Sequence, residues 1–223
     1  MDADSILGSI NVLQCMRKYG GERIVFPSSG FLYGNTAKFP TPETESIQPV
    51  SPYVVSKNAV ENYLWFYKHA FNINYIIFRY AAIYGPGQQT GAMADYIRKL
   101  SIGKQADIWG DGTKTRDYVF IDDVVRANLL VLELPLDYSN PLFNIGTGKQ
   151  TTLNDLYNKI AQILNKNPNP TYHEDRVGEQ MKYSLDSAKI KEVLNWEPQI
   201  SLDTGLNKTI EYHLKHQQNL QFL

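Results

Sequence analysis

Tyr53 and Lys57 lie four positions apart in the segment SPYVVSK (51–57). Ser51 and Pro52 predict that a helix begins here, because a serine hydroxyl can accept a bond from a free backbone N–H and proline fits the first helical position. Tyr53 and Lys57 then share one helix face. A nearby ammonium favours the phenolate and lowers the pKa of a tyrosine, which would make Tyr53 a useful base near neutral pH. The same spacing also occurs on solvated helices without a function, so the pair alone decides nothing.

Composition limits the class of protein. The chain has 223 residues, 43% of them hydrophobic and 20% charged, which is the balance of a soluble globular protein. Its 22 basic and 23 acidic residues give a formal net charge of −1, so we expect neither nucleic acid nor an acidic membrane as a partner. No apolar run approaches the roughly 20 residues that cross a bilayer.

The N-terminus and the single cysteine point to a cytoplasmic protein. MDADSILGSI lacks the basic region and apolar core of a signal peptide. Cys15 is the only cysteine, which excludes a disulfide within the chain. Its surroundings, NVLQCM, are typical of the apolar face of a helix, so we predict a buried structural thiol there. No metal site is predicted.

Helices and strands alternate along the sequence. Helical spacing places Ile6, Ile10, Leu13 and Met16 on one side of the first helix. The alternation predicts an α/β protein with a largely parallel sheet. Strands are expected at 22–26, 74–80 and 141–146, with two short strands within 106–121, and helices at 4–18, 52–71, 92–102, 122–134, 152–165, 187–194 and 203–216.

Several motifs follow these elements in order. They are the pair Ser28–Ser29 after a strand, YxxxK at a helix start, RYAAIYGPGQ (79–88), GDGTKTRDYVFIDDVVRA (110–127), FNIGTGKQTTL (143–153), RVGE (176–179) and a closing segment over 185–212. Together they resemble the extended short-chain dehydrogenase/reductase family, in its NAD-dependent sugar-nucleotide epimerase/dehydratase branch, which includes UDP-glucose 4-epimerases. The resemblance covers nearly the whole chain.

The resemblance assigns roles to individual residues. Tyr53 would take a proton from a sugar hydroxyl, Lys57 would hold the nicotinamide ribose, and Ser29 would bridge Tyr53 and the sugar oxygen. Ser28 and Tyr80 would lie beside the cofactor.

The substrate side of the site is assigned in the same way. Arg116 and Arg176 would clamp the nucleotide diphosphate, a role that suits a guanidinium fork. Arg116 could instead form a structural pair with Asp117 or Asp122. Tyr183 would face the hexose.

The implied chemistry is a transient hydride transfer to NAD. The resulting keto sugar turns over and takes the hydride back on its other face, so NAD is not consumed. The implied substrate is a UDP-hexose, and the implied assembly is a homodimer through the helices at 4–18 and 52–71.

The front of the family's pattern is not found. A strand, a GxxGxxG turn and an acidic residue after the second strand normally bind the dinucleotide. Their absence from this sequence predicts a partial Rossmann-like parallel sheet over 1–90, joined by a strand near 141–146 and followed by a smaller C-terminal α/β substrate lobe over 91–223. We read GPGQQTG (85–91) and GTGK (146–149) as turns, since neither has the spacing of a phosphate loop. A chain with this truncation is expected to bind NAD weakly or not at all and to be inactive by itself.

Three positions separate the possible activities. Ala82 stands where the family often has a substrate-contacting Asn. Gly30 and Phe31 stand where dehydratases carry an acidic residue for eliminating water. The sequence therefore favours a UDP-hexose 4-epimerase over a dehydratase. A truncated nucleotide-sugar-binding or interaction module, and a reductase that consumes NADPH, remain the alternatives.

Overall fold

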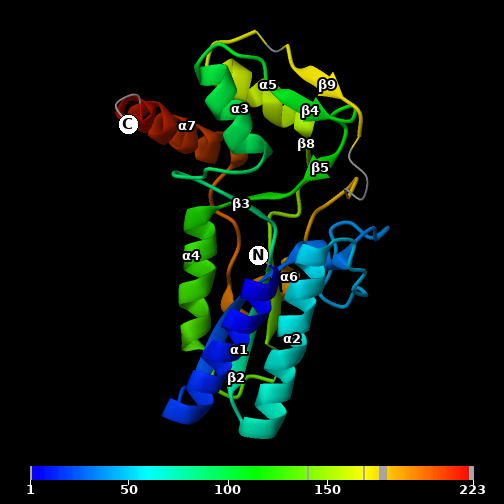
Figure 1. Ribbon diagram of the computed structural model, residues 1–223, viewed down its shortest axis with the longest axis vertical. Coiled ribbons are helices and arrows are strands. Elements are labelled where there is room, and N and C mark those ends of the chain that lie inside the picture. Colours follow the sequence, from blue (N-terminus) through cyan, green and yellow to red (C-terminus); the bar gives the residue numbers. More distant parts are fainter. Residues whose placement is uncertain (1, 140, 168, 176–179, 221–223) are drawn as a thin grey trace.

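A three-stranded parallel sheet forms the base of the protein. The computed structural model describes residues 2–139, 141–167, 169–175 and 180–220 (Figure 1). The sheet has the order β1 (Arg23–Ser29), β2 (Asn74–Tyr80), β7 (Leu142–Ile145), and both pairings are parallel. Ile77 packs into the apolar cluster on one face of β2, whereas Ile76 and Phe78 pack into the cluster on the other. Both faces of the sheet are thus buried, as parallel sheets require.

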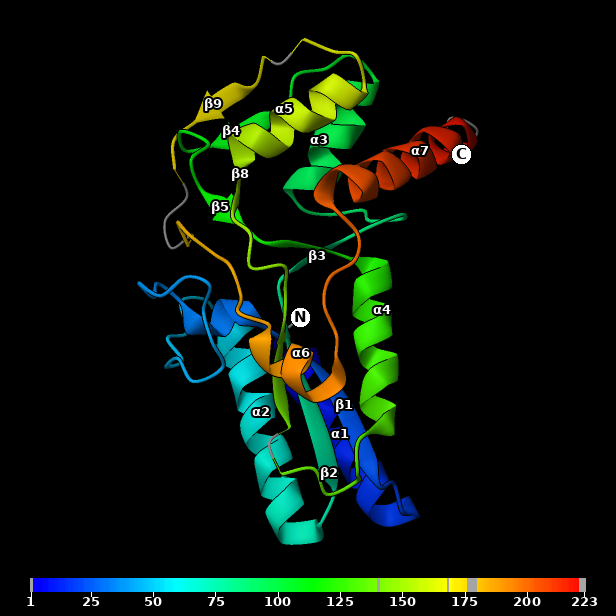
Figure 2. The same ribbon diagram turned by 180° about the vertical axis from the view of Figure 1, so that it is seen from behind.

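Helices cover the two faces of this sheet. α1 (Asp2–Tyr19) and α2 (Pro52–Phe71) lie side by side on one face, and α4 (Ile121–Leu130) and α6 (Ala188–Leu194) lie on the other (Figures 1 and 2). Leu13 and Leu64 bring α1 and α2 onto Phe26 and Ile77 of the sheet. These contacts confirm the predicted α/β class with a Rossmann-like parallel sheet.

The remaining elements form an upper lobe. It contains α3 (Ala92–Ser101), α5 (Leu153–Ile163), α7 (Leu202–Leu220), the parallel pair β4 (Asp107–Trp109) and β9 (Thr171–His173), and the antiparallel pair β5 (Thr115–Arg116) and β8 (Thr151–Thr152). The parallel pair β3 (Ala82–Tyr84) and β6 (Tyr118–Phe120) runs between the sheet and this lobe (Figure 2). Two 3-10 turns complete the fold, η1 (Gly30–Tyr33) and η2 (Val131–Glu133).

The chain passes between the two parts more than once. α4 and α6 follow residue 91, yet their residues Val124 and Ile190 pack into the apolar cluster of the sheet. The sheet part is therefore built from both sides of the predicted boundary, and a division near residue 90 stays a prediction.

Two local predictions are wrong. Cys15 is exposed, because it lies two positions after the fully buried Leu13 and so points away from the face that packs on the sheet. Ser51 does precede α2 in an extended conformation, but its side chain forms no capping hydrogen bond.

The predicted turns are confirmed, with positive φ angles of 84° at Gly87 and 72° at Gly148. Among the described residues, no helix is long and apolar enough to cross a membrane.

A buried ion pair ties α2 to the sheet. Arg79 of β2 and Glu61 of α2 lie 2.6 Å apart, with side chains only 5% and 9% exposed. Ser28 of β1 donates a hydrogen bond of 2.5 Å to the same carboxylate. The Arg79 guanidinium also lies 4.9 Å from the centre of the Tyr33 ring. One carboxylate thus joins β1, β2 and α2.

This arrangement makes Arg79 a sensitive position. Arg79→Met leaves the Glu61 charge buried without its partner, and we expect the free energy of unfolding in urea to fall by about 3–5 kcal/mol. Lys159→Met provides the control, since Lys159 pairs with Asp203 at the surface, and it should cost less than about 1 kcal/mol. Equal effects of the two substitutions would contradict a structural role for the buried pair.

Candidate active site

The predicted catalytic residues meet at the carboxyl end of the sheet. Ser29 is the last residue of β1, and Tyr53 and Lys57 lie in the first two turns of α2. The Ser29 side chain lies close enough to Tyr53 to lower the pKa of its phenol by hydrogen bonding. Lys57 Nζ donates a bond of 2.8 Å to the Pro27 carbonyl of β1 and lies 5.8 Å from the centre of the Tyr53 ring. Tyr53 is 42% exposed, so a ligand can reach it.

The pKa of Tyr53 differs from the prediction. Burial raises this pKa above the ordinary value, and the hydrogen bond from Ser29 lowers it only in part. The expectation that Lys57 lowers the pKa of Tyr53 is therefore wrong for this structure. The physical reason is that the Lys57 amine is directed at the Pro27 carbonyl, while burial lowers its own pKa and so disfavours its charge. Tyr53 is a neutral phenol at pH 7.

The two residues predicted only for the cofactor are less accessible. Ser28 is 4% exposed, and its hydroxyl is engaged with Glu61. Tyr80 is 9% exposed, and its hydroxyl accepts a bond of 2.8 Å from Asn128. Burial raises the pKa of Tyr80 to about 12. Their contacts with a cofactor stay predictions, and Tyr53 and Lys57 are the groups that offer free surface.

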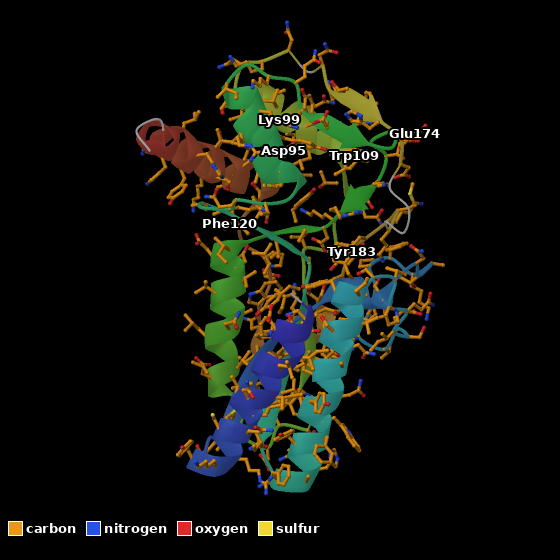
Figure 3. The ribbon with its side chains drawn as sticks, in the orientation of Figure 1. Asp95, Lys99, Trp109, Phe120, Glu174 and Tyr183 are labelled. Carbon is orange, nitrogen blue, oxygen red and sulfur yellow. The ribbon has the colours of Figure 1, made fainter. Side chains whose placement is uncertain are left out.

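A cavity of about 610 Å³ connects this end of the sheet with the upper lobe. Phe31 and Ala82 line it near Ser29, and Trp109 of β4 lines it within the lobe. Figure 3 shows Asp95, Lys99 and Trp109 within the upper lobe, above Tyr183. A volume of this size lies within the range of ligand pockets, which is roughly 300–1,000 Å³.

Arg116 also lines this cavity. Its Nη1 donates to the carbonyls of Thr115 and Gln180 at 2.7 and 2.9 Å, and its guanidinium carbon lies 5.6 Å from the centre of the Phe31 ring. Neither of the two acids considered as its partner, Asp117 and Asp122, pairs with Arg116. Asp117 is instead fully buried among hydrogen-bond donors of its own, and Asp122 lies 3.7 Å from Lys208.

The other predicted substrate residues have different outcomes. Arg176 lies outside the described residues. Tyr183 is 2% exposed, its hydroxyl donates to the Tyr80 carbonyl at 2.9 Å, and its ring stacks on Phe31 at 4.6 Å between centroids. Tyr183 thus lies behind Phe31, so its placement favours support of the cavity wall over direct contact with a hexose.

The predicted site omitted four aromatic residues that line the cavity, namely Phe31, Tyr96, Trp109 and Tyr118. Tyr118 had a readable signal, since alternation in the extended segment TRDY puts it on the same side as Arg116. Trp109 had none, because a tryptophan in a short strand is equally typical of a core. Trp109 in fact stacks on His173 at 4.8 Å, and Asp107 bonds that imidazole at 2.6 Å.

Known proteins share both the sequence pattern and the geometry. Residues 3–146 match the model of the NAD dependent epimerase/dehydratase family. The chain belongs to this family. The resemblance inferred from the motifs is thereby confirmed.

Individual relatives of this chain come from the same family. A putative UDP-glucose 4-epimerase of Methanocaldococcus jannaschii is 37% identical over 93% of this chain and 68% of that protein. The UDP-glucose 4-epimerase of Mycolicibacterium smegmatis is 34% identical over 93% of this chain and 67% of its own length. The chain thus spans about two thirds of these relatives.

Solved structures are similar throughout the described fold. The Thermotoga maritima UDP-glucose 4-epimerase with UDP-glucose has a TM-score of 0.91 and 41% identity, covering 97% of this chain and 71% of that one. A dTDP-glucose 4,6-dehydratase from Streptomyces venezuelae also has a TM-score of 0.91, at 27% identity, and covers 97% of this chain and 67% of that one. The fold alone therefore does not separate epimerases from dehydratases.

The Tyr53 environment gives a pH prediction. The difference in ultraviolet absorbance between the unaltered protein and Tyr53→Phe isolates the titration of this phenol, and its midpoint should lie above the ordinary 10.0. Ser29→Ala should move the midpoint further up, because the hydrogen bond that it removes lowers the pKa. A midpoint below 10.0 would show that the Lys57 charge outweighs burial.

Proposed function

We propose that this protein is an NAD-dependent nucleotide-sugar 4-epimerase that acts on a UDP-hexose. The observation that carries the proposal is the meeting of Ser29, Tyr53 and Lys57 beside Phe31, which lines the same cavity as Arg116. The proton-transfer groups thus lie next to one wall of a ligand-sized space that also contains a candidate phosphate-binding group. Family membership and the names of the relatives support the same class.

The residues present fit the nicotinamide end of NAD. Tyr53 is exposed, and the Lys57 amine donates one bond to Pro27, so an ammonium there has further N–H groups for ribose hydroxyls. The sequence contains no GxxGxxG segment that would cradle the pyrophosphate, so the expectation of weak NAD binding and inactivity stays a prediction. The proposed function requires the opposite case, in which the residues at the nicotinamide end are sufficient. Bound NAD supplies a hydride acceptor and, in its oxidised ring, a positive charge.

The protein's own part is proton transfer and orientation. Tyr53 would accept the proton of the sugar 4-hydroxyl, and Ser29 would hold that hydroxyl in line with the phenol. Because burial raises the pKa of Tyr53, this residue would become a base only when a ligand brings further positive charge near its oxygen and the phenol has released its own proton to solvent. The same proton would return to the sugar oxygen at the end of the cycle, so the base needs no net exchange with water.

Arg116 would bind the diphosphate. Its Nη1 is held by two carbonyls, which fixes the plane of the guanidinium against the Phe31 ring and leaves its remaining N–H groups for phosphate oxygens. A guanidinium that is already held in one orientation loses little conformational entropy when the diphosphate binds. Arg176, predicted to share this role, stays a prediction.

An epimerase fits better than a dehydratase at one specific place. Elimination of water needs an acid and a base near the sugar. Gly30 is closely packed instead, since an added Cβ would lie 2.8 Å from Leu185 side-chain atoms. Phe31 is stacked on Tyr183, so the two positions present an apolar wall.

Calorimetric titration of NAD, with and without UDP-glucose, tests the proposal. We expect both ligands to bind, and Arg116→Ala should weaken UDP-glucose binding by at least about tenfold, the effect of losing a charged hydrogen bond. Tyr53→Phe is the matched control, because it removes only the reacting hydroxyl and should keep the affinity for UDP-glucose. Binding of UDP-glucose without NAD would instead identify a nucleotide-sugar-binding module, and binding of neither would refute the proposal.

We also propose that the protein is a homodimer through α1 and α2. The outer faces of these adjacent helices expose large apolar side chains, namely Leu7, Val12, Tyr63, Trp65 and Phe66. Exposed apolar area on this scale is typical of a protein interface. Light scattering should give twice the 25.4 kDa chain mass, and a monomer at micromolar concentration would count against the dimer.

A further inference from the structure

Asp117 is a buried carboxylate between Arg116 and Tyr118, two residues that line the cavity. Its side chain has no exposed surface. Thr147 donates to it twice, from its backbone N–H at 2.9 Å and from its hydroxyl at 2.5 Å. The backbone N–H groups of Gly148 and Leu185 donate to the other carboxylate oxygen at 3.0 and 3.1 Å. Two segments that are distant from Asp117 in sequence, the turn with Thr147 and Gly148 and the segment at Leu185, therefore converge on its side chain.

The GTGK turn is shaped around this carboxylate. Consecutive backbone N–H groups that point to one centre form an anion-binding concavity, as in phosphate loops. Here Asp117 itself fills that concavity. Gly146 is required for the close approach, because an added Cβ would lie 2.6 Å from a carboxylate oxygen of Asp117. The turn is thus an internal anchor for Asp117, and its N–H groups are not free for a ligand.

The neighbours of Asp117 face the ligand cavity. Arg116 and Tyr118 both line the cavity, and side chains alternate along an extended strand, so Asp117 lies on the opposite side. The Asp117 carbonyl also accepts a bond of 2.9 Å from the N–H of Ala82, another cavity residue. Holding the Asp117 carboxylate in place therefore fixes the backbone of this extended segment. It also fixes the direction in which the Arg116 and Tyr118 side chains point.

We propose that Asp117 is a positioning residue whose carboxylate, held inside the GTGK turn, sets the Arg116 guanidinium for binding a nucleoside diphosphate. The choice of ligand class rests on the function proposed above. The Asp117 carboxylate also positions Phe31 indirectly. It binds the backbone N–H of Leu185, and the same segment carries Tyr183, whose ring stacks on Phe31. Phe31 in turn faces the Arg116 guanidinium.

Two substitutions of the anchor test this role. Asp117→Asn keeps the shape but puts an NH₂ group or a neutral oxygen against backbone N–H donors, and we expect the affinity for UDP to fall by at least about tenfold. Thr147→Val removes only the hydroxyl donor and should give a smaller loss of a few-fold. This milder variant keeps the test decisive if Asp117→Asn does not fold.

Asp123→Asn is the matched control. Asp123 is also a buried carboxylate, 2% exposed, that accepts bonds of 3.0 Å from the backbone N–H groups of Gln199 and Ile200. Its substitution should lower the stability without changing the affinity for UDP. A purely structural role of Asp117 would make the two variants behave alike in calorimetry.

Amide hydrogen exchange supplies a second readout that needs no ligand. Exchange at Thr147, Gly148 and Leu185 should be faster in Asp117→Asn than in Asp123→Asn. Unchanged exchange at these three amides, or an unchanged affinity for UDP in Asp117→Asn, would overturn the inference. If the unaltered protein does not bind UDP, the proposed function fails together with the ligand part of this inference, whereas exchange still decides whether Asp117 anchors the turn.

Discussion

The buried pair of Glu61 and Arg79 is the constraint on which the candidate site depends. Tyr53, Lys57 and Glu61 follow one another at intervals of four residues, so they lie along one side of α2. Glu61 cannot leave Arg79 without exposing an uncompensated charge to the interior of the protein. The helix is thereby fixed against rotation and sliding. Its first turns deliver Lys57 to the Pro27 carbonyl and Tyr53 to Ser29.

A second buried carboxylate organises the other side of the cavity. Glu61 is satisfied by charged and hydroxyl donors, whereas Asp117 is satisfied by backbone N–H groups and one hydroxyl. Both are acids whose burial would be costly if they were unpaired. Arg116 and Tyr118, the neighbours of Asp117, line the cavity, whereas Tyr53 and Lys57, which are aligned with Glu61, lie at the carboxyl end of the sheet. The site thus has a rigid support under its proton-transfer end and another under Arg116.

The sequence predicted the elements of the sheet better than the upper lobe. Strands such as NYIIFRY contain a short apolar run, here YIIF, and the helices beside them have clear periodicity, so both could be located. β5 and β8 have two residues each and exist only because they pair with each other, which no local pattern reveals. Ser29, Tyr53 and Lys57 were predicted together from motif order. The pKa of Tyr53 was mispredicted because spacing shows that Lys57 is near but not that its amine points at Pro27.

The fate of the hydride tests the central claim most directly, since the site is described as one that lifts it from the sugar and returns it to the same carbon. The measurement is an incubation with NAD and UDP-glucose deuterated at C4, followed by NMR of the products. The account predicts UDP-galactose that retains deuterium at C4. Loss of deuterium to water, a 4-keto-6-deoxy product, or no inversion at C4 would contradict it.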